Sequence, residues 1–407
     1  MEIKEILSSF NRNDYQRENF DSFLSSIKFS YNVPSIHIAG TNGKGSTANY
    51  IAAIYQENGY KVGKFTSPWL FKVNEMITIN NEPIKDEDFL SIFNEYEKKF
   101  KKFDLSSFEI ETFIALTYFS AQKCDMAVIE CGMGGEIDAT NIFTPILSII
   151  TSVSLEHTEF LGHTISEVAM QKAGIIKEKV PVLIDEFHED AVTTIYKVAS
   201  SLEAPVQFIK KHVETSLNDD GVSLLYHPYG EVKLSSHALY ATTDACFALE
   251  AALLLSDRFQ IDYEKAKAGI KKIQMSCRFD IVNKSPLVIL DGAHNPEAAK
   301  EATQAIMRYL GDHRPIHVIF SCFRDKNLGA LLSSFGSLGR DLTLTTFPNP
   351  RARTEDEYFL FLGDHPFVED AVQLVKSKME EFKYDVILVT GSLAFVSYIK
   401  KEVFNHD

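Results

Sequence analysis

The chain has 407 residues, of which 45% are hydrophobic and 24% are charged, and its formal net charge is -15. This composition is typical of a globular protein with two or three domains of about 150 residues each. An acidic chain lacks the basic field of nucleic-acid and membrane-surface binders, and no apolar run reaches the roughly 20 residues of a transmembrane helix, so these classes are excluded.

The first predicted elements are a strand, a glycine-rich loop and a helix. Residues 35–39 are apolar and predict a buried strand, and the sequence GTNGKGST follows directly at 40–47. Apolar residues then recur along 48–55 at the spacing of one helix face. Gly59 ends this helix, and residues 61–66 predict the next strand.

The loop has the residue types that hold the phosphates of a nucleotide. A glycine-rich turn before a helix presents backbone N–H groups to an anion. Lys44 adds a positive charge, and Ser46 or Thr47 adds a hydroxyl. The spacing departs from the Walker A motif, because two residues rather than four separate the first glycines and Gly45 follows the lysine. The alternative is an exposed turn with a solvated lysine, but the strand–loop–helix context favours a site for a nucleoside triphosphate.

Strands and helices continue to alternate along the first half of the chain. Ser106 and Glu109 have the capping-box spacing of a helix N-terminus, and residues 127–130 and 146–151 predict strands buried on both faces. In the middle of the chain, short apolar stretches predict an antiparallel accessory sheet. Its strands are residues 205–209, 221–226 and 231–234, with a hairpin turn at 227–230.

The second half of the chain predicts another α/β domain. It begins with a strand at 287–290 and a helix from Pro296, and its later strands are residues 316–320, 341–347 and 385–390. The Asn-Lys-Ser-Pro sequence at 283–286 marks the best boundary, so we predict domains at 1–284 and 285–407. The predicted fold is α/β: a phosphate-loop nucleotide-binding domain with a mostly parallel sheet and a small antiparallel accessory sheet, followed by a smaller Rossmann-like α/β domain.

Polar side chains follow three of the predicted strands at their carboxyl ends. Ser67, Glu130 and His157 each end or closely follow one of the first domain's strands. Taken singly, each is more typical of a turn residue or a structural histidine. Open α/β sheets bind ligands at the carboxyl ends of their strands, and Mg²⁺ prefers oxygen ligands. Glu130 is therefore a candidate Mg²⁺ ligand, and the convergence of the three residues beside the phosphate loop favours a functional site over the structural alternatives.

On a longer set of motifs, the chain resembles the folylpolyglutamate synthase/dihydrofolate synthase group of the Mur ligase superfamily. The motifs run in family order across nearly the whole chain, and their joint occurrence by chance is negligible. They are GTNGKGST (40–47), SP (67–68), FE (108–109), ECGMGG-x-x-DATN (130–141), H-x-x-x-LG-x-T (157–164), KAGIIK (172–177), R (278), DGAHNP (291–296), DK (325–326), RA (351–352) and TGSL (390–393).

The resemblance implies an ATP-dependent ligase that forms an amide between L-glutamate and a folate-type carboxylate through an acyl phosphate. It implies ATP, one or two Mg²⁺ ions, small-molecule substrates and closure of two domains over the nucleotide. Folylpolyglutamate synthesis and dihydrofolate synthesis both stay open. The five cysteines lack paired metal-ligand spacing and the N-terminus lacks a signal-peptide core, so we expect a cytoplasmic protein. We also expect a monomer without nucleic-acid or membrane partners.

The resemblance also implies roles for individual residues. Lys44, His157, Lys172 and Arg278 match catalytic positions, and Lys172 matches a lysine that the family carbamylates. The implied ATP contacts are Thr41, Asn42, Gly43, Lys44, Gly45, Ser46, Thr47, Arg278 and, at the ribose, Asp291. The implied metal ligands are Ser67, Glu130, His157 and, if carbamylated, Lys172. Positions near the incoming amino acid are matched by His294 and Ser392, for which a buried histidine and a helix N-cap are the alternatives.

Several residues depart from the family pattern. Trp69 stands in place of a histidine, and Met76 and Glu136 each stand in place of an arginine. Ser276 and Cys277 replace the usual Pro-Gly that precedes the family's arginine. The loss of cations and the gain of an acid near the acceptor loops weaken the attraction for an anionic acceptor. We therefore hypothesise a divergent member whose acceptor is not ordinary folate.

Three other functions compete with this interpretation. A related ligase could act on another carboxylate, but only about 34 residues precede the first strand, too few for the N-terminal domain expected of a cell-wall precursor enzyme. A guanine-selective switch would carry Asn-Lys-x-Asp, and the sequence at 283–286 is Asn-Lys-Ser-Pro. A catalytically silent nucleotide-binding paralogue is disfavoured because Lys44, Glu130 and Arg278 are intact.

Overall fold

The computed structural model describes residues 2–10, 17–210, 214–218, 221–311, 314–339, 341–363 and 365–404. The chain divides into two units. The first consists of residues 1–214, 224–233 and 243–273, and the second of residues 215–223, 234–242 and 274–407. Among the described residues, no helix is long and apolar enough to cross a membrane.

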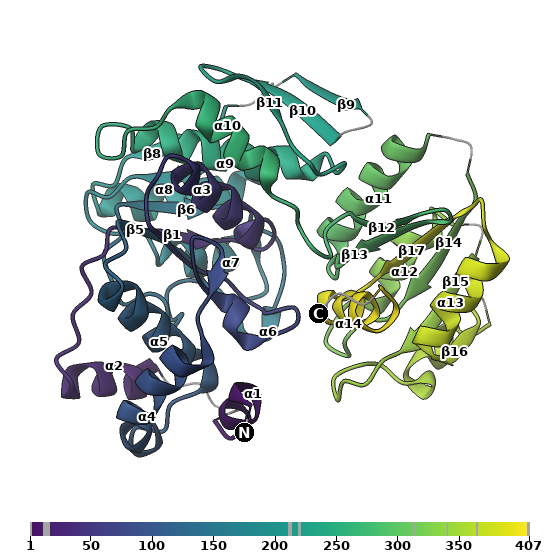
Figure 1. The fold of residues 1–407 in the computed structure, drawn as a ribbon, viewed down its shortest axis with the longest axis horizontal. Coiled ribbons are helices and arrows are strands. Elements are labelled where there is room, and N and C mark those ends of the chain that lie inside the picture. Colours follow the sequence, from purple (N-terminus) through teal and green to yellow (C-terminus); the bar gives the residue numbers. More distant parts are fainter. Residues whose placement is uncertain are drawn as a thin grey trace. The chain divides into compact units, whose positions relative to one another are not determined.

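A sheet of eight strands forms the frame of the first unit (Figure 1). Its order is β4-β3-β2-β5-β1-β6-β7-β8; the strands from β2 to β8 are parallel, and β3 and β4 add an antiparallel edge. The central strands are buried along their whole length, as their apolar sequences predict. The bounds are β1 Ser35–Ala39, β2 Val62–Phe65, β3 Ile77–Ile79, β4 Glu82–Pro83, β5 Met126–Glu130, β6 Leu147–Ile150, β7 Val182–Ile184 and β8 Val206–Phe208.

Helices cover both faces of this sheet. Gly63 of β2 faces α5 (Ser107–Ala121), since a Cβ there would lie 2.7 Å from the Phe119 ring. The next residue, Lys64, points to the opposite face, which α3 (Lys44–Glu57) covers. The other helices up to residue 272 are α1 Ile3–Ser8, α2 Arg17–Ser26, α4 Asp86–Lys102, α6 Thr158–Leu161, α7 Ile165–Ala173, α8 Glu189–Ser201, α9 Tyr240–Leu254 and α10 Tyr263–Lys272, and η1 (Val73–Met76) is a 3₁₀ turn.

The local predictions for α3 and α5 are confirmed. The Ser106 hydroxyl accepts a hydrogen bond from the N–H of Glu109 at 3.3 Å, and the Glu109 carboxylate accepts one from the N–H of Ser106 at 2.7 Å. Ile51 and Tyr55, on the predicted apolar face of α3, are fully buried. The helix therefore begins directly at the glycine-rich loop, with its N-terminus at the carboxyl end of β1.

One prediction for the middle of the chain is wrong. The strand at 205–209 does not belong to the accessory sheet, because β8 pairs parallel with β7 at the edge of the main sheet. The preceding helix, α8, makes the crossover that returns the chain in a parallel direction. The accessory sheet has the order β11-β10-β9 and is confirmed for the other two segments. Its strands are β9 Thr215–Asn218, β10 Gly221–Tyr226 and β11 Gly230–Lys233.

The second unit has a six-stranded sheet of order β12-β13-β17-β14-β15-β16, in which only the pair β12–β13 is antiparallel. Its strands are β12 Asp280–Lys284, β13 Leu287–Asp291, β14 Ile316–Phe320, β15 Asp341–Thr346, β16 Phe367–Asp370 and β17 Val386–Thr390. Its helices are α11 Pro296–Leu310, α12 Leu328–Gly336, α13 Ala371–Glu381 and α14 Leu393–Phe404, and η2 (Glu355–Phe361) is a 3₁₀ turn.

The predicted fold class is confirmed: a mostly parallel sheet, a small antiparallel sheet and a second α/β sheet occur in this order. The predicted division between residues 284 and 285 falls on the turn between β12 and β13. The last change from the first unit to the second lies between Ile273 and Gln274, and residues 215–223 and 234–242 also belong to the second unit.

Candidate functional site

The phosphate loop, residues 40–47, joins β1 to α3. Gly43 precedes the helix with φ +83°, a left-handed conformation that favours glycine. Lys44 is the first residue of α3, and its ammonium donates hydrogen bonds to the carbonyls of Gly40 at 2.9 Å and Thr41 at 3.2 Å. The backbone N–H groups of the first helical turn and the lysine charge therefore lie together, as anion binding requires.

Residues that follow β6 hold the phosphate loop from the side. The N–H of Asn42 donates to Ser152 Oγ at 2.7 Å, and Thr151 Oγ1 donates to the carbonyl of Asn42 at 2.6 Å. The N–H of Ser154 donates to Thr41 Oγ1 at 3.1 Å. These contacts were not predicted from the sequence. The Thr-Ser-Val-Ser run directly after a buried strand is the pattern that indicates them, because hydroxyl side chains there do not contribute to an apolar core.

Glu130 and Ser67 lie beside the phosphate loop. The N–H of Ser67 donates to Glu130 Oε2 at 3.0 Å. A Cβ at Gly45 would lie 3.2 Å from the same oxygen, so the carboxylate packs directly against the loop. Glu130 is buried at the end of β5. The structure thus brings together three of the predicted elements: the loop, the serine after β2 and the acid after β5.

His157 and Lys172 lie on two short helices that follow β6. His157 precedes α6 with φ +50°, and its Nε2 lies 3.6 Å from Glu156 Oε1. Lys172 is in the last turn of α7 and is buried. Burial raises the pKa of the Cys131 thiol well above its usual range, and the charges of Lys44 and Lys172 oppose this shift. The positive charges of both lysines therefore act on the thiol of Cys131, the residue that follows Glu130.

The donor set fits a magnesium ion. Glu130 offers a carboxylate, Ser67 a hydroxyl, and Thr47 a buried Oγ1 that has no hydrogen-bond partner in the described part of the chain. Mg²⁺ binds such oxygen ligands and keeps several waters, so it does not need a cage of protein side chains. No group of three or more His, Cys, Asp and Glu side chains suited to a metal occurs among the described residues. The ligand set Ser67, Glu130, His157 and carbamylated Lys172 stays a prediction.

A buried polar network fixes the glycine turn after Glu130. Asp138 accepts hydrogen bonds from the N–H groups of Met133 at 2.8 Å and Thr140 at 2.9 Å. The Thr140 hydroxyl lies 2.8 Å from His37 Nε2, and Cys131 Sγ lies 3.1 Å from the same nitrogen. Burial, together with the charge of Lys177, lowers the pKa of His37 to about 3, so this imidazole is neutral. The motif at 130–141 contains Cys131, Asp138 and Thr140, but its sequence does not indicate their pairing with His37.

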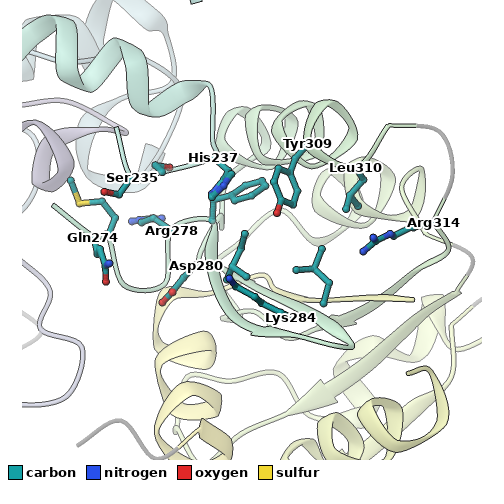
Figure 2. A pocket seen from close by; sticks show the side chains of 14 residues that line it. Ser235, His237, Gln274, Arg278, Asp280, Lys284, Tyr309, Leu310 and Arg314 are labelled. Atoms are coloured by element: carbon teal, nitrogen blue, oxygen red, sulfur yellow. The ribbon is translucent and has the colours of Figure 1, made fainter. Parts of the chain in front are cut away.

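In the second unit, Arg278 lines a cavity of about 650 Å³ (Figure 2). The cavity lies among the segments before α9 and β12, the β12–β13 hairpin and the end of α11. Lys284 and Arg314 add two further cations to its lining, and among the described residues that line it Asp280 is the one carboxylate. The excess of positive charge in an otherwise acidic protein suits an anionic ligand.

Asp291 is buried and orders the backbone around the Arg278 loop, which we define as residues 276–280. Its Oδ2 accepts hydrogen bonds from the Tyr240 hydroxyl at 2.7 Å and the Phe279 N–H at 2.9 Å. Its Oδ1 accepts one from the Ala293 N–H at 2.9 Å. These bonds give Asp291 a structural role, and its contact with a ribose stays a prediction.

The two residues assigned to the amino-acid substrate follow β13 and β17. His294 is half-buried, and its Nδ1 lies 2.9 Å from the carbonyl of Gly292. Ser392 is buried directly before α14. Gly292 packs against Leu393, since a Cβ there would lie 2.8 Å from that side chain. His294 and Ser392 therefore come from neighbouring strand ends, because β13 and β17 pair in parallel.

Three of the departures from the family pattern, Trp69, Met76 and Glu136, lie in different environments. The Trp69 ring lies under the ammonium of Lys4, at 5.3 Å from the ring centre. Met76 is buried in the hydrophobic core of the first unit, so its replacement of an arginine is a matter of packing. The Glu136 carboxylate is exposed and accepts a hydrogen bond from Gln171 at 3.4 Å. Only Glu136 adds a charge to the glycine turn.

Comparison with protein families gives two matches. The Mur ligase middle domain matches residues 38–239, and the glutamate ligase domain of Mur ligases matches residues 277–393. The dihydrofolate synthase/folylpolyglutamate synthase of Bacillus subtilis is 30% identical over 391 residues, with 91% of this chain and 90% of the relative covered. The dihydrofolate synthetase of Saccharomyces cerevisiae is 33% identical over 335 residues, with 77% of each chain covered.

Solved structures give the same picture. Folylpolyglutamate synthase of Mycobacterium tuberculosis, complexed with ADP and AMPPCP, superposes with a TM-score of 0.90 at 24% identity, covering 100% of this chain and 98% of the other. At this identity the likeness concerns the fold alone. Escherichia coli FolC in complex with DHPP and ADP superposes with a TM-score of 0.88 at 27% identity, covering 98% of this chain and 97% of the other.

Proposed function

Because the chain belongs to the folylpolyglutamate synthase/dihydrofolate synthase family, whose members are ATP-dependent ligases, we propose that it joins L-glutamate to a folate-type carboxylate. The observation that supports this proposal most strongly is the cluster in the first unit. There the phosphate loop with Lys44, the carboxylate of Glu130 and the N–H of Ser67 lie against one another.

The chemistry requires activation of a carboxylate, since amide formation from an acid and an amine in water is uphill. We propose that the acceptor carboxylate attacks the terminal phosphate of ATP, which gives an acyl phosphate and ADP. The amine of L-glutamate then attacks the acyl carbon, and phosphate leaves. Protein catalysis of phosphoryl transfer consists mainly of positioning and charge stabilisation.

Lys44 and Arg278 supply that stabilisation in this proposal. The N–H groups at the start of α3 bind the phosphates, and Lys44 exchanges its bonds to the carbonyls of Gly40 and Thr41 for bonds to phosphate oxygens. Arg278 neutralises charge on the transferring group. Ser67, Glu130 and His157, with Lys172 as a carbamate, would hold Mg²⁺, which when bound supplies positive charge to the phosphate oxygens.

Two apolar side chains near His157 suit a flat acceptor. Leu155 and Phe160 are 48% and 63% exposed, so both offer apolar surface to a ligand. An aromatic acceptor that covered them would remove apolar surface from water. The acidic Glu136 on the glycine turn supports the second candidate, a ligase of the same family whose acceptor carries less negative charge than ordinary folate.

Phosphate release in the presence of ATP, Mg²⁺ and L-glutamate tests both candidates. Dihydropteroate and tetrahydrofolate are offered separately as acceptors. Turnover with either one supports the first candidate and identifies which of the two activities the chain has. No turnover with both, together with turnover on a less anionic aromatic carboxylate, would favour the second candidate. Absence of phosphate release with every carboxylate acceptor would contradict a ligase.

We also propose that the protein works in the cytoplasm. All five cysteines are buried and have free thiols. Thiols persist where the redox environment is reducing, and disulfides form mainly outside the cytosol.

A further inference from the structure

The backbone on both sides of Arg278 has an unusual conformation. Cys277 has φ +62° and Phe279 has φ +46°, although neither is glycine. Non-glycine residues keep left-handed conformations only where their surroundings hold them firmly. The Arg278 loop must therefore be fixed by contacts outside its own backbone, since its local preference is for another conformation.

One anchor lies on the β13 side of the loop. Asp291 Oδ2 accepts the N–H of Phe279 at 2.9 Å, and the N–H of Gly292 donates to the carbonyl of Cys277 at 2.9 Å. These bonds tie the loop to the end of β13. They hold Cys277 and Phe279, one residue on each side of Arg278, but not the ends of the loop at Ser276 and Asp280.

The other anchor is Lys400, from α14. Its ammonium donates hydrogen bonds to Ser276 Oγ at 3.0 Å and to Asp280 Oδ2 at 2.7 Å. Asp280 Oδ2 also accepts the N–H of Cys277 at 2.9 Å. The side chains of Lys400 and Asp280 are only 9% and 18% exposed, so water screens their ion pair weakly. One lysine thus holds both ends of the loop.

Lys400 also determines which cation pairs with the Asp280 carboxylate. Arg278 and Asp280 come from the same loop and line the same cavity (Figure 2). Without Lys400, the Asp280 carboxylate would lack its cation and would become available to the guanidinium two residues away. Such a pair would neutralise the charge that Arg278 needs for an anionic ligand.

A sequence departure fits this arrangement. The family pattern that the chain resembles has Pro-Gly where this chain has Ser276 and Cys277. Proline restricts the backbone by itself and glycine adopts positive φ without cost, whereas serine and cysteine do neither. Ser276 instead offers a hydroxyl to Lys400, a contact that proline cannot make. The charged anchor therefore supplies a restriction that serine and cysteine do not supply by themselves.

We propose that Lys400 is a positioning residue for Arg278: it holds the Arg278 loop in its left-handed conformation and keeps Asp280 away from the guanidinium. Lys400 touches neither substrate nor nucleotide in this proposal. The proposal rests on the function given above for Arg278, namely stabilisation of the transferring phosphate.

The test compares Lys400→Met with Lys401→Met, an exposed neighbour on α14 that serves as the matched control. Lys400→Met lowers kcat by roughly 10- to 100-fold, because displacement of a catalytic group by about 1 Å costs that much. It also weakens AMPPCP binding relative to ADP binding, since only AMPPCP carries the terminal phosphate. Lys401→Met leaves both quantities unchanged, and Lys400→Arg restores part of the loss.

A second substitution separates positioning from simple stability. Asp280→Asn in the Lys400→Met background removes the competing carboxylate, so kcat rises above that of Lys400→Met, and the double variant has no unpaired buried charge to prevent folding. A further fall of kcat in the double variant would overturn the proposal. So would Lys400→Met with unchanged kcat and an unchanged ratio of AMPPCP to ADP affinity. Arg278→Ala is the reference: full activity in that variant would contradict the proposed function itself.

Discussion

The phosphate loop and the Arg278 loop are held in place by different forces. The phosphate loop is fixed by hydroxyl and backbone groups from residues 151–154, and its left-handed position is occupied by Gly43. The Arg278 loop has left-handed positions without glycine and is fixed by charged groups, namely Lys400, Asp280 and Asp291. Residues 151–154 bond to the first loop through neutral hydroxyl and backbone groups, whereas ion pairing between Lys400 and Asp280 contributes to holding the second.

The difference follows from what each loop offers a ligand. The phosphate loop presents backbone N–H groups, and the hydroxyls of Thr151 and Ser152 bond to it without adding a negative charge. The Arg278 loop presents one guanidinium, which stays available only if nearby carboxylates already have partners. We therefore expect the phosphate loop to be impaired by added volume and by loss of the Lys44 charge. We expect the Arg278 loop to be impaired by loss of its anchoring charges.

Loss of the phosphate-loop cation gives the largest expected effect. Lys44→Ala should lower kcat/KM by roughly 100- to 1,000-fold, because a positioned charge on the transferring group is removed. The fold should survive, since Lys44 bonds only to carbonyls of its own loop. Steady-state phosphate release measures the effect, and circular dichroism checks the fold. Lys85→Ala, an exposed lysine before α4, is the control. Undiminished turnover in Lys44→Ala would remove the phosphate-loop assignment.

Added volume in the same loop should have the next largest effect. A Cβ at Gly45 would lie 3.2 Å from Glu130 Oε2, so Gly45→Ala displaces this carboxylate by a few tenths of an ångström. We expect kcat to fall by about 10-fold to 100-fold with little change in thermal stability. Gly336→Ala, where a Cβ would meet nothing within 4 Å, is the matched control. Equal activity of the two variants would show that Glu130 does not need its observed position.

In the Arg278 loop, removal of an anchoring carboxylate should appear first in stability. Asp291→Ala leaves the Phe279 and Ala293 N–H groups without their acceptor, so we expect a loss of about 3 kcal/mol in unfolding free energy. Tyr240→Phe removes one bond to the same carboxylate and should cost about 1 kcal/mol. Thermal unfolding of both variants gives the comparison. A smaller loss in Asp291→Ala than in Tyr240→Phe would contradict the anchoring role.

The pH dependence of stability tests whether His37, in the buried network after Glu130, is neutral in the folded protein. Burial, and the charge of Lys177, lower the pKa of His37 to about 3 from its ordinary 6.5. Between these values the unfolded chain binds a proton that the folded chain does not, so stability falls as pH falls from 6.5 towards 3. At pH 5 the loss relative to pH 7 is on the order of 2 kcal/mol. His37→Gln should remove this part of the pH dependence; an unchanged slope would exclude His37 as its source.

The sequence predicted the elements that local patterns determine. The strand at 35–39, the helix after the phosphate loop and the capping box at Ser106 follow from residues close together in the chain, and all are confirmed. The contact of Ser67 with Glu130 followed from parallel strands ending at one edge. These inferences need only periodicity and topology.

The rest depends on pairing between distant residues. Thr151 lies 109 residues from Asn42, and Lys400 lies 120 residues from Asp280, so no local pattern joins them. The strand at 205–209 is short, and its sequence carries no signal for parallel or antiparallel pairing. Met76 was interpreted as a lost cation near the acceptor, but its side chain is in the core. Burial of a single residue in a loop region depends on the packing around it.

Glu136 gives the smallest expected effect and sharpens the comparison at the acceptor. It is the one exposed charge among the three departures, on the glycine turn that the Asp138 network holds rigid. Glu136→Arg should lower KM for an anionic folate-type acceptor by about 5-fold, since replacing an acid with a base near an exposed site changes the interaction by about 1 kcal/mol. Glu136→Gln separates removal of the acid from addition of the base and should give an intermediate value. The effect should shrink at high salt, because exposed charges are screened. If KM is the same with Glu, Gln and Arg at position 136, this residue does not influence acceptor choice. The hypothesis of a less anionic acceptor then loses the one exposed charge that supports it.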